Sequence, residues 1–417
     1  MRATLTVRTP PEPNREALAL SQALCERIRD RIAQAGGWMR FDRYMQCVLN
    51  EPGLGYYSAG SAKFGAAGDF VTAPALGPFL ARAIARQFDG MLGSLDAPVI
   101  LEIGAGDGTL AAQLLDALDA VDAGNTDVRD DAFAGSTVFD AGAAGAMDHS
   151  SNERRRAPVQ YLILEPSADL RSRQRARLAR FADRVRWLER LPERPVEGLI
   201  LANEVVDALP VARFIKRGNA VLPLGVRCGD GGFEWAEGDR DAELSAAIAS
   251  LEAALGEPLP DGYRSEICLL LGGWIESLAA TLARGAVLLV DYGGVRREYY
   301  HPERRDGTLI CHYRHRAHDD PFFLPGLQDV SAWVDFSACA DAAGDAGFDV
   351  AGFTTQGLFL AESVAAVPDA IALDAPSASA LKTLVLPGEM GERFRLLLLT
   401  RGMPPPGLPG RDMRGWL

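Results

Sequence analysis

A short glycine-rich segment constrains the fold of this chain more than any other feature. The apolar run Val99–Leu101 leads into Glu102, and glycines follow at alternate positions, Gly104, Gly106 and Gly108. A helix-like stretch begins at the next residue. A buried strand, a tight glycine loop and a helix start together bring the backbone close to a nucleotide-like ligand, although a plain tight turn is the alternative.

The spacing of these glycines differs from that of the dinucleotide-binding fingerprint. That pattern requires glycine at position 109, where Thr109 stands, and this argues against a dehydrogenase. A carboxylate at Glu102, two residues before the first glycine, suits a ligand with a positively charged end. S-adenosylmethionine (SAM) is such a ligand, because it carries a sulfonium and an ammonium group and no phosphate.

Composition and charge exclude several classes of protein. The 417-residue chain has a net charge of −13, which disfavours binding to nucleic acid. Its six cysteines are scattered and form no C-x-x-C pair, as in a reducing compartment. The N-terminal residues 1–16 lack the apolar core of a signal peptide, and no apolar run is long enough to span a membrane. We expect a cytoplasmic protein without membrane insertion, and the oligomeric state is not predicted.

Strand-like and helix-like segments alternate after residue 98, which predicts a parallel α/β sheet. The strands are expected at 99–103, 161–165, 185–188, 198–203 and 286–291, with two final strands at 348–355 and 394–400. We divide the chain into an N-terminal helical segment with a cofactor-closing loop, 1–95, and a core, 96–417. The core carries a substrate-side insertion near 212–282.

Residues 119–157 differ from their surroundings because they are rich in Ala, Gly, Asp and Ser and nearly lack large apolar residues. This composition predicts a disordered insertion. Glu165 lies 57 residues beyond Gly108, but only 18 once these 39 residues are set aside. That shorter spacing is typical of an acid that binds ribose hydroxyls at the end of the second strand. Alternatively, Glu165 could lie at a helix N-terminus, where a carboxylate interacts favourably with the helix dipole.

A second polar cluster follows the strand 198–203. Asn203 ends that strand, and Glu204 and Asp207 are three residues apart, so one helical turn would place them on the same face. Two carboxylates beside a methyl donor could orient a guanidinium through paired hydrogen bonds. A helix that is N-capped by Asn203 and begins with two acids explains the same spacing equally well.

Three further segments have less specific patterns. Asp69 and Thr72 lie in a polar turn and could either close over a cofactor or cap a helix beginning near Ala75. The spacing of His312, His315 and His318 favours a basic loop over a metal site, because arginines lie between them. No G-x-S-x-G motif is present, and this excludes a typical serine hydrolase.

Several blocks of the chain resemble the MidA-like family of class I SAM-dependent methyltransferases. Residues 101–110 are similar to the first motif of class I methyltransferases in general. The narrower resemblance rests on an ordered set of blocks between about residue 20 and residue 360, namely 55–57, 65–74, 165–167, 203–211, 291–293 and 325–336.

The resemblance implies a Rossmann-like α/β core of mostly parallel strands flanked by helices, with added N-terminal and inserted helical elements. It implies SAM as cofactor and no metal. The family includes a mitochondrial protein-arginine methyltransferase that assists respiratory complex I assembly, so the implied acceptor is an arginine of a protein such as a complex I subunit. The implied cofactor-binding residues are Glu102, Gly104, Gly106, Gly108, Glu165, Pro166, Ser167, Asp69 and Thr72.

For methyl transfer, the resemblance implies Asn203, Glu204 and Asp207 beside the methyl donor, with Asp291 and Tyr292 on the substrate side. The chain departs from the family pattern at Ala75 and Trp333, which lie outside the implied methyl-transfer centre and are expected on the substrate side. Two alternatives therefore stay open: a methyltransferase acting on a small molecule, and an assembly factor that binds SAM without turnover.

Overall fold

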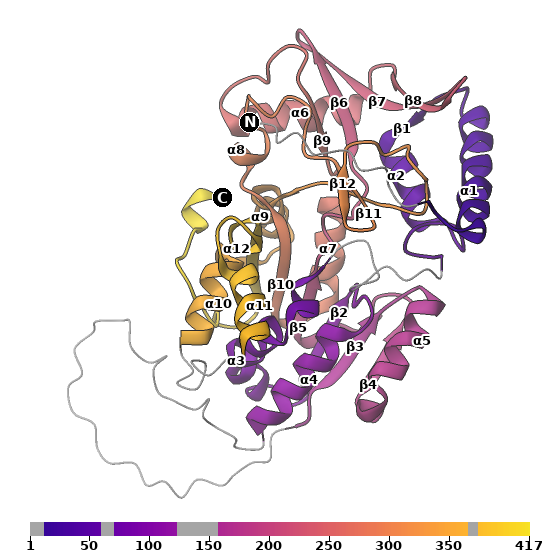
Figure 1. Cartoon of the computed structure of the whole chain (residues 1–417). Coiled ribbons are helices and arrows are strands. Elements are labelled where there is room, and N and C mark those ends of the chain that lie inside the picture. The colour runs from indigo at the N-terminus through magenta and orange to yellow at the C-terminus, as the bar shows by residue number, and fades with distance from the viewer. Residues whose placement is uncertain (1–11, 60–70, 123–156, 366–373) are drawn as a thin grey trace, which may run out of the picture.

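A computed structural model of the chain describes residues 12–59, 71–122, 157–365 and 374–417, and within them eight strands form the central sheet (Figure 1). The five strands from β10 to β4 are parallel, while β16 is antiparallel to both of its neighbours. The parallel α/β sheet expected from the sequence is confirmed. The strand order is β15 (Asp349–Thr355), β16 (Phe394–Arg401), β10 (Leu282–Gly294), β5 (Val196–Asn203), β2 (Val99–Ile103), β3 (Gln160–Leu164) and β4 (Val185–Leu188), with β14 (Val334–Asp335) paired to β10.

The central strands are apolar along their length because helices cover both faces of the sheet. Alternate residues such as Ile100 and Leu288 belong to a core that includes residues of helices on one face, and Leu101 and Leu289 belong to a core on the other. Helices of the first layer are α3 (Phe79–Gly93), α4 (Thr109–Asp122), α10 (Gln356–Ala365) and α11 (Ala375–Val385). The second layer contains α7 (Leu271–Thr281) and α9 (Phe336–Asp345).

A second group of elements occupies the upper part of Figure 1, away from α3, α4 and α5 (Ala168–Arg177). It combines N-terminal and inserted segments, which share two further apolar cores. Its helices are α1 (Arg15–Gln34), α2 (Phe41–Asn50), α6 (Ala242–Leu255) and α8 (Arg296–Tyr299). Its strands are β1 (Met39–Arg40), β6 (Ala212–Arg217), β7 (Ala220–Gly229), β8 (Gly232–Glu237), β9 (Arg264–Ile267), β11 (Ile310–Tyr313), β12 (Arg316–His318) and β13 (Asp329–Ser331).

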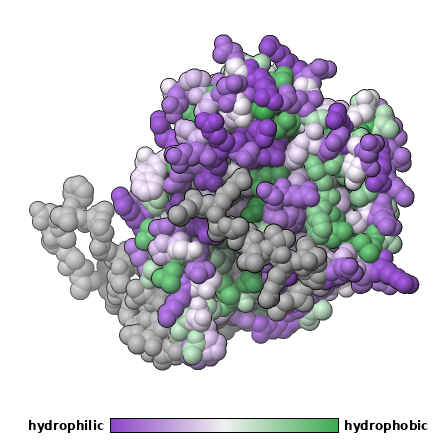
Figure 2. Space-filling model, turned by 45° about the horizontal axis from the view of Figure 1, so that its top comes forward, coloured by the Kyte–Doolittle hydropathy of each residue, from purple (hydrophilic) through white to green (hydrophobic). Residues whose placement is uncertain are grey.

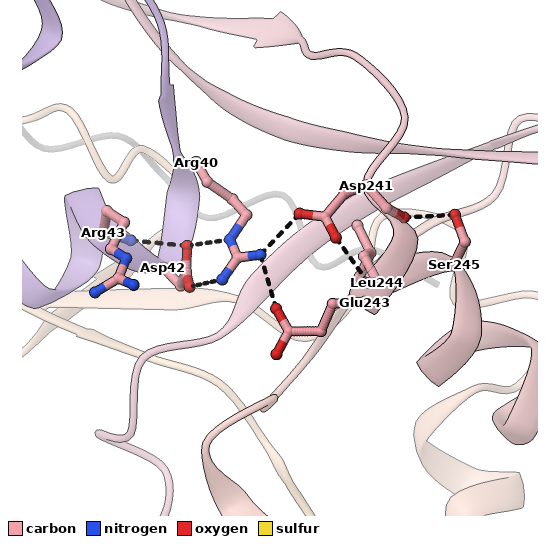
Figure 3. Close-up of polar contacts among 7 residues, drawn as sticks. All are labelled: Arg40, Asp42, Arg43, Asp241, Glu243, Leu244 and Ser245. Atoms are coloured by element: carbon pink, nitrogen blue, oxygen red, sulfur yellow. Dashed lines mark hydrogen bonds and ion pairs between the residues drawn. The ribbon is translucent and has the colours of Figure 1, made fainter. Parts of the chain in front are cut away.

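Arg40 links the N-terminal segment to the inserted one (Figure 3). Its guanidinium binds both carboxylate oxygens of Asp42, at 2.8 and 2.7 Å, and reaches Asp241 at 2.9 Å and Glu243 at 3.3 Å. Asp241 also accepts a hydrogen bond from Leu244 and so caps α6. The paired acids raise the pKa of Arg40, so its charge is retained at this junction. Segments about 200 residues apart in the chain are thereby joined.

Two local expectations change in the structure. The helix predicted near Ala75 is instead a short 3₁₀ turn, η1 (Ala73–Leu76), followed by the separate helix α3. The three histidines lie on and between β11 and β12, a hairpin with Arg314 and His315 at positive φ in its turn. Among the described residues, no group of three or more His, Cys, Asp or Glu side chains could bind a metal ion.

Some expectations fall outside the described residues or stay predictions. Asp69 and positions 123–156 of the predicted insertion are not described, and the boundary between residues 95 and 96 stays a prediction. No helix in the described part of the chain is long and apolar enough to cross a membrane. Hydrophilic residues cover much of the face in Figure 2, with apolar patches between them.

Close backbone contacts across the sheet predict that Gly198 cannot be replaced by a residue with a Cβ without loss of stability. Gly198 on β5 lies between Val99 and Gly285 and has φ +146°. A Cβ at Gly198 would overlap the carbonyl oxygen of Val99. We expect Gly198→Ala to lower the free energy of unfolding by about 3 kcal/mol or more, measured by chemical denaturation.

A second glycine provides the matched control. Gly90 lies in α3, and a Cβ added there would have no atom within 4 Å. Gly90→Ala should be neutral or stabilise the protein by up to about 1 kcal/mol, because alanine favours the helix. Equal destabilisation by both substitutions would contradict the close approach inferred at Gly198.

Candidate functional site

The residues predicted for the site lie at one edge of the central sheet. Glu102, Glu165, Asn203 and Asp291 stand at or near the carboxyl ends of β2, β3, β5 and β10, which are parallel strands. In open α/β sheets this edge is where ligands bind. The fold therefore brings together side chains that are up to 189 residues apart in the sequence.

The loop after β2 has a backbone that only glycine adopts readily. Gly104, Gly106 and Gly108 have φ values of +69°, +55° and +82°. A Cβ at Gly104 would lie 2.8 Å from the side chain of Val205, so this loop packs directly against the turn that follows β5. The glycine spacing thus reflects both backbone conformation and close packing, as the sequence suggested.

Glu165 follows β3 and is 5% exposed. One of its carboxylate oxygens accepts a hydrogen bond from the amide of Ser167 at 2.8 Å, and the other accepts one from the side chain of Gln174 at 3.1 Å. Ser167 also caps α5 by accepting from the amide of Leu170. The carboxylate is therefore held in one orientation beside the glycine loop.

Glu102 is buried in the sheet rather than open at its edge. Its carboxylate accepts a hydrogen bond of 2.8 Å from the hydroxyl of Tyr161 on β3, and both side chains are almost fully buried. Burial raises the pKa of Glu102 to about 7, although the bond from Tyr161 lowers it. Its contact with a cofactor stays a prediction.

The segment Glu204–Asp207 is a turn and not the helical turn considered from the sequence. Glu204 has φ +55°, a strained value for a residue other than glycine. Asn203 consequently does not cap a helix; its amide nitrogen donates to Glu204 at 3.2 Å. Its carbonyl oxygen, Oδ1, is buried and has no hydrogen-bond partner among the residues that the structure describes.

Asp291 holds this turn in place. One of its carboxylate oxygens lies 3.1, 2.9 and 3.3 Å from the backbone amides of Val205, Val206 and Asp207, which donate to it. The other accepts from the amide of Tyr292 at 2.9 Å. Asp291 is completely buried and binds the turn with one oxygen and the amide of Tyr292 with the other. Its expected place on the substrate side stays a prediction.

Four acids form a carboxylate cluster at this edge, Glu204, Asp207, Asp291 and Asp329. Burial and the neighbouring acids raise the pKa of Glu204 to about 8, that of Asp291 to about 8 and that of Asp207 well above its usual value. In the described part of the chain, no ion pair involves the first three of these acids. With these raised pKa values the acids hold their protons near neutral pH, and a cationic ligand beside them would favour their ionised form.

Several residues of the site were not predicted individually. Asp329 comes from β13, where one of its oxygens accepts from the hydroxyl of Tyr57 at 2.9 Å. The hydroxyl of Tyr292, a residue predicted on the substrate side, lies 2.5 Å from Ser331 Oγ and hydrogen-bonds to Asp207. Asp329 lies in a block quoted for the family resemblance, which was the available signal; nothing in the sequence singled out Gln174.

Two other residues predicted to bind the cofactor, Thr72 and Pro166, lie in the described part of the chain. The side chain of Thr72 makes no capping bond to η1, so the capping alternative is not supported for it. The backbone amide of Ala73, the next residue, hydrogen-bonds to Glu204, and this brings the turn containing Thr72 to the carboxylate cluster. Pro166 lies between Glu165 and Ser167 and is exposed.

Comparisons with known proteins agree with this arrangement. Residues 143–354 match a family described as "Putative S-adenosyl-L-methionine-dependent methyltransferase". A crystal structure of a Burkholderia thailandensis protein bound to S-adenosyl-homocysteine is similar, with a TM-score of 0.80 and 38% identity over 97% of this chain and 99% of that one. A native crystal structure from the same organism has a TM-score of 0.80 and 37% identity over 98% and 100%. No curated protein matches the chain.

The raised pKa of Glu204 makes stability depend on pH. Its folded value of about 8 exceeds the ordinary 4.5, so the folded state binds more protons between these values and stability falls as pH rises through that range. We expect Glu204→Gln to melt at nearly the wild-type temperature at pH 4.5, and several degrees above it at pH 8.5.

Differential scanning calorimetry at a series of pH values checks this. Glu197→Gln, at an exposed position on the same strand, is the control and should show no gap that grows with pH. A constant difference between wild type and Glu204→Gln at all pH values would contradict the assigned titration.

Proposed function

The chain belongs to this family of SAM-dependent methyltransferases, and on that premise we propose that it methylates an arginine side chain of a protein. The observation that carries the proposal is the carboxylate cluster beside the glycine loop, in which neither Glu204 nor Asp207 has a cationic partner among the described residues. A guanidinium is the protein side chain that best matches paired carboxylates.

The cofactor is SAM, and the first of the two Burkholderia relatives is bound to its demethylated product. The residues present fit it: three glycines at positive φ give the backbone room to approach a ligand, and Asn203 Oδ1 is a buried acceptor that has no partner in the described part of the chain. Glu165 would bind the ribose hydroxyls. When bound, SAM supplies a methyl group on a positively charged sulfur.

Glu204 and Asp207 would act by binding and orienting the acceptor. A guanidinium delocalises its charge and is a poor nucleophile, and paired carboxylates draw that charge toward the nitrogens that do not react. The reacting nitrogen gains the methyl carbon, the carbon–sulfur bond breaks with its electron pair left on sulfur, and the nitrogen loses a proton. A carboxylate of the cluster, ionised beside the bound guanidinium, would accept that proton.

The acceptor is proposed to be a protein, and a respiratory complex I subunit is the expectation from the family resemblance. The net charge of −13 favours a basic acceptor segment over nucleic acid. Arginine methylation and a role in complex I assembly stay proposals, because the family defines the reaction class and not the acceptor.

A cavity beside Asp207 favours a second candidate, methylation of a small molecule. Its volume of about 210 Å³ is below the roughly 300–1,000 Å³ of most ligand pockets, so it suits a small acceptor or a single side chain. Asp207 provides one charged group of its wall, and Arg296, another, is paired with Asp335 and Asp341. Its other walls include Val211, Leu251, Leu271, Tyr299, Tyr300 and Trp333.

Labelling distinguishes these candidates. The protein is incubated with a protein extract and SAM labelled in its methyl group, and the acid hydrolysate is separated by chromatography. We expect the label in methylated arginine. Label only in a small-molecule fraction would support the second candidate, and tight binding of S-adenosyl-homocysteine with no label in any fraction would support an assembly factor without turnover.

Removal of the two charges tests the assigned roles. We expect Glu204→Gln with Asp207→Asn to lower the rate of methyl transfer by about 100-fold or more, since the guanidinium loses its charged partners. Affinity for S-adenosyl-homocysteine, measured by calorimetric titration, should change by no more than about threefold.

Glu197→Gln is again the control, and circular dichroism confirms that each variant is folded. Transfer at the wild-type rate in the double variant would show that these carboxylates do not bind the acceptor.

A further inference from the structure

A buried glutamine joins the two elements expected to bind the cofactor. We propose that Gln174 is a positioning residue that orients the Glu165 carboxylate toward the ribose hydroxyls and thereby sets the recognition of those hydroxyls. This inference rests on the proposed role of Glu165. It concerns cofactor recognition and does not depend on which acceptor is methylated.

Every polar group of the Gln174 side chain has a partner. The residue is completely buried. Its amide nitrogen donates to the carbonyl oxygen of Gly106 at 2.8 Å and to Glu165 Oε2 at 3.1 Å. Its carbonyl oxygen accepts from the indole nitrogen of Trp187 at 2.9 Å. The side chain therefore connects the glycine loop, the end of β3 and the edge strand β4.

The chemistry of these partners allows one orientation of the amide. The indole of Trp187 is only a donor, whereas the Gly106 carbonyl is only an acceptor, and Glu165 accepts in its ionised form. A flipped amide would place its nitrogen against a donor and its oxygen against two acceptors. Three contacts thus fix the direction of the hydrogen bond that Glu165 receives.

The helix that carries Gln174 is docked along the glycine loop. Arg177, one turn further along α5, donates to the carbonyl oxygen of Asp107 at 3.0 Å and pairs with its carboxylate at 2.8 Å. A Cβ at Gly108 would lie 3.4 Å from Gln174 Cγ, in ordinary contact. Since the loop and the helix pack this closely, Gln174 maintains its two donor contacts without moving.

A carboxylate that binds two vicinal hydroxyls must keep one rotation about its terminal torsion. That torsion is broad for glutamate and is set by its hydrogen bonds. In Glu165 one oxygen is held by the amide of Ser167 from its own turn, and the other by Gln174 from a neighbouring helix. Loss of Gln174 would remove this bond to the second oxygen and leave the bond from Ser167 to the first.

Calorimetric titration of the full chain tests this with two probes, S-adenosyl-homocysteine and its 2′-deoxy analogue. Wild type should bind the analogue more weakly, because Glu165 loses one hydroxyl partner. We expect Gln174→Ala to weaken S-adenosyl-homocysteine about tenfold, and the analogue less, so that the preference between them shrinks. Gln87→Ala on α3, where Gln87 bonds to the carbonyl of Pro406, is the matched control and should keep wild-type values.

Trp187→Phe provides a second variant that keeps a smaller aromatic ring at this position and removes the bond to Gln174. It should reduce the preference in the same direction by a smaller factor, and it tests the proposal if Gln174→Ala does not fold. Equal weakening of both probes in these variants, with the preference kept, would show that Gln174 has only a structural role and would overturn the inference. Glu165→Ala separates the role of Glu165 from that of Gln174. If this variant still prefers S-adenosyl-homocysteine over the 2′-deoxy analogue, Glu165 does not bind the ribose hydroxyls, and the proposed function of Glu165 is contradicted whatever the Gln174 variants show.

Discussion

The buried carboxylate of Asp291 is the interaction on which the candidate site depends. It receives hydrogen bonds from the backbone amides of three successive residues of the turn after β5 and from that of Tyr292. Without it, buried amides would lack partners, at a cost of about 1–3 kcal/mol each. The same bonds fix Glu204 in its strained conformation and direct Glu204 and Asp207 to the sheet edge, so one buried acid determines where two others stand.

Ionisation of the acids gathered at this edge opposes the folded state. Burial raises the pKa values of Glu204, Asp207 and Asp291, and the neighbouring acids raise them further. Such a site is unfavourable while empty and becomes favourable when a cation enters, because the cation restores the charge balance. Stability and binding are therefore in opposition here: a neutral variant of Glu204 should fold better at high pH and bind a guanidinium worse. This is common where strain and charge serve a site.

The site also requires the second group of elements. Asp329 lies on β13 and is bound by Tyr57, which follows α2, so both come from outside the central sheet. The cavity beside Asp207 is likewise walled by α6 and α8 of this group, together with α7 and α9 of the central layer. The parallel sheet supplies the edge at which the cofactor is proposed to bind, whereas the N-terminal and inserted segments supply much of what would surround the proposed acceptor. Differences in acceptor among related chains would therefore be sought in these segments.

The sequence by itself determined the parallel sheet, the glycine loop and the position of Glu165, because apolar runs, positive-φ glycines and strand-end acids are local patterns. It also identified Glu204 and Asp207, but wrongly allowed a helical turn between them, since the conformation of Glu204 follows from Asp291 on another strand. Tyr161, Gln174 and Asp329 could not be found in this way. Each acquires its role from a hydrogen bond to a partner 9 to 272 residues away. Only the tertiary structure decides such contacts, because a hydrogen bond between residues far apart in the chain produces no local pattern in the sequence.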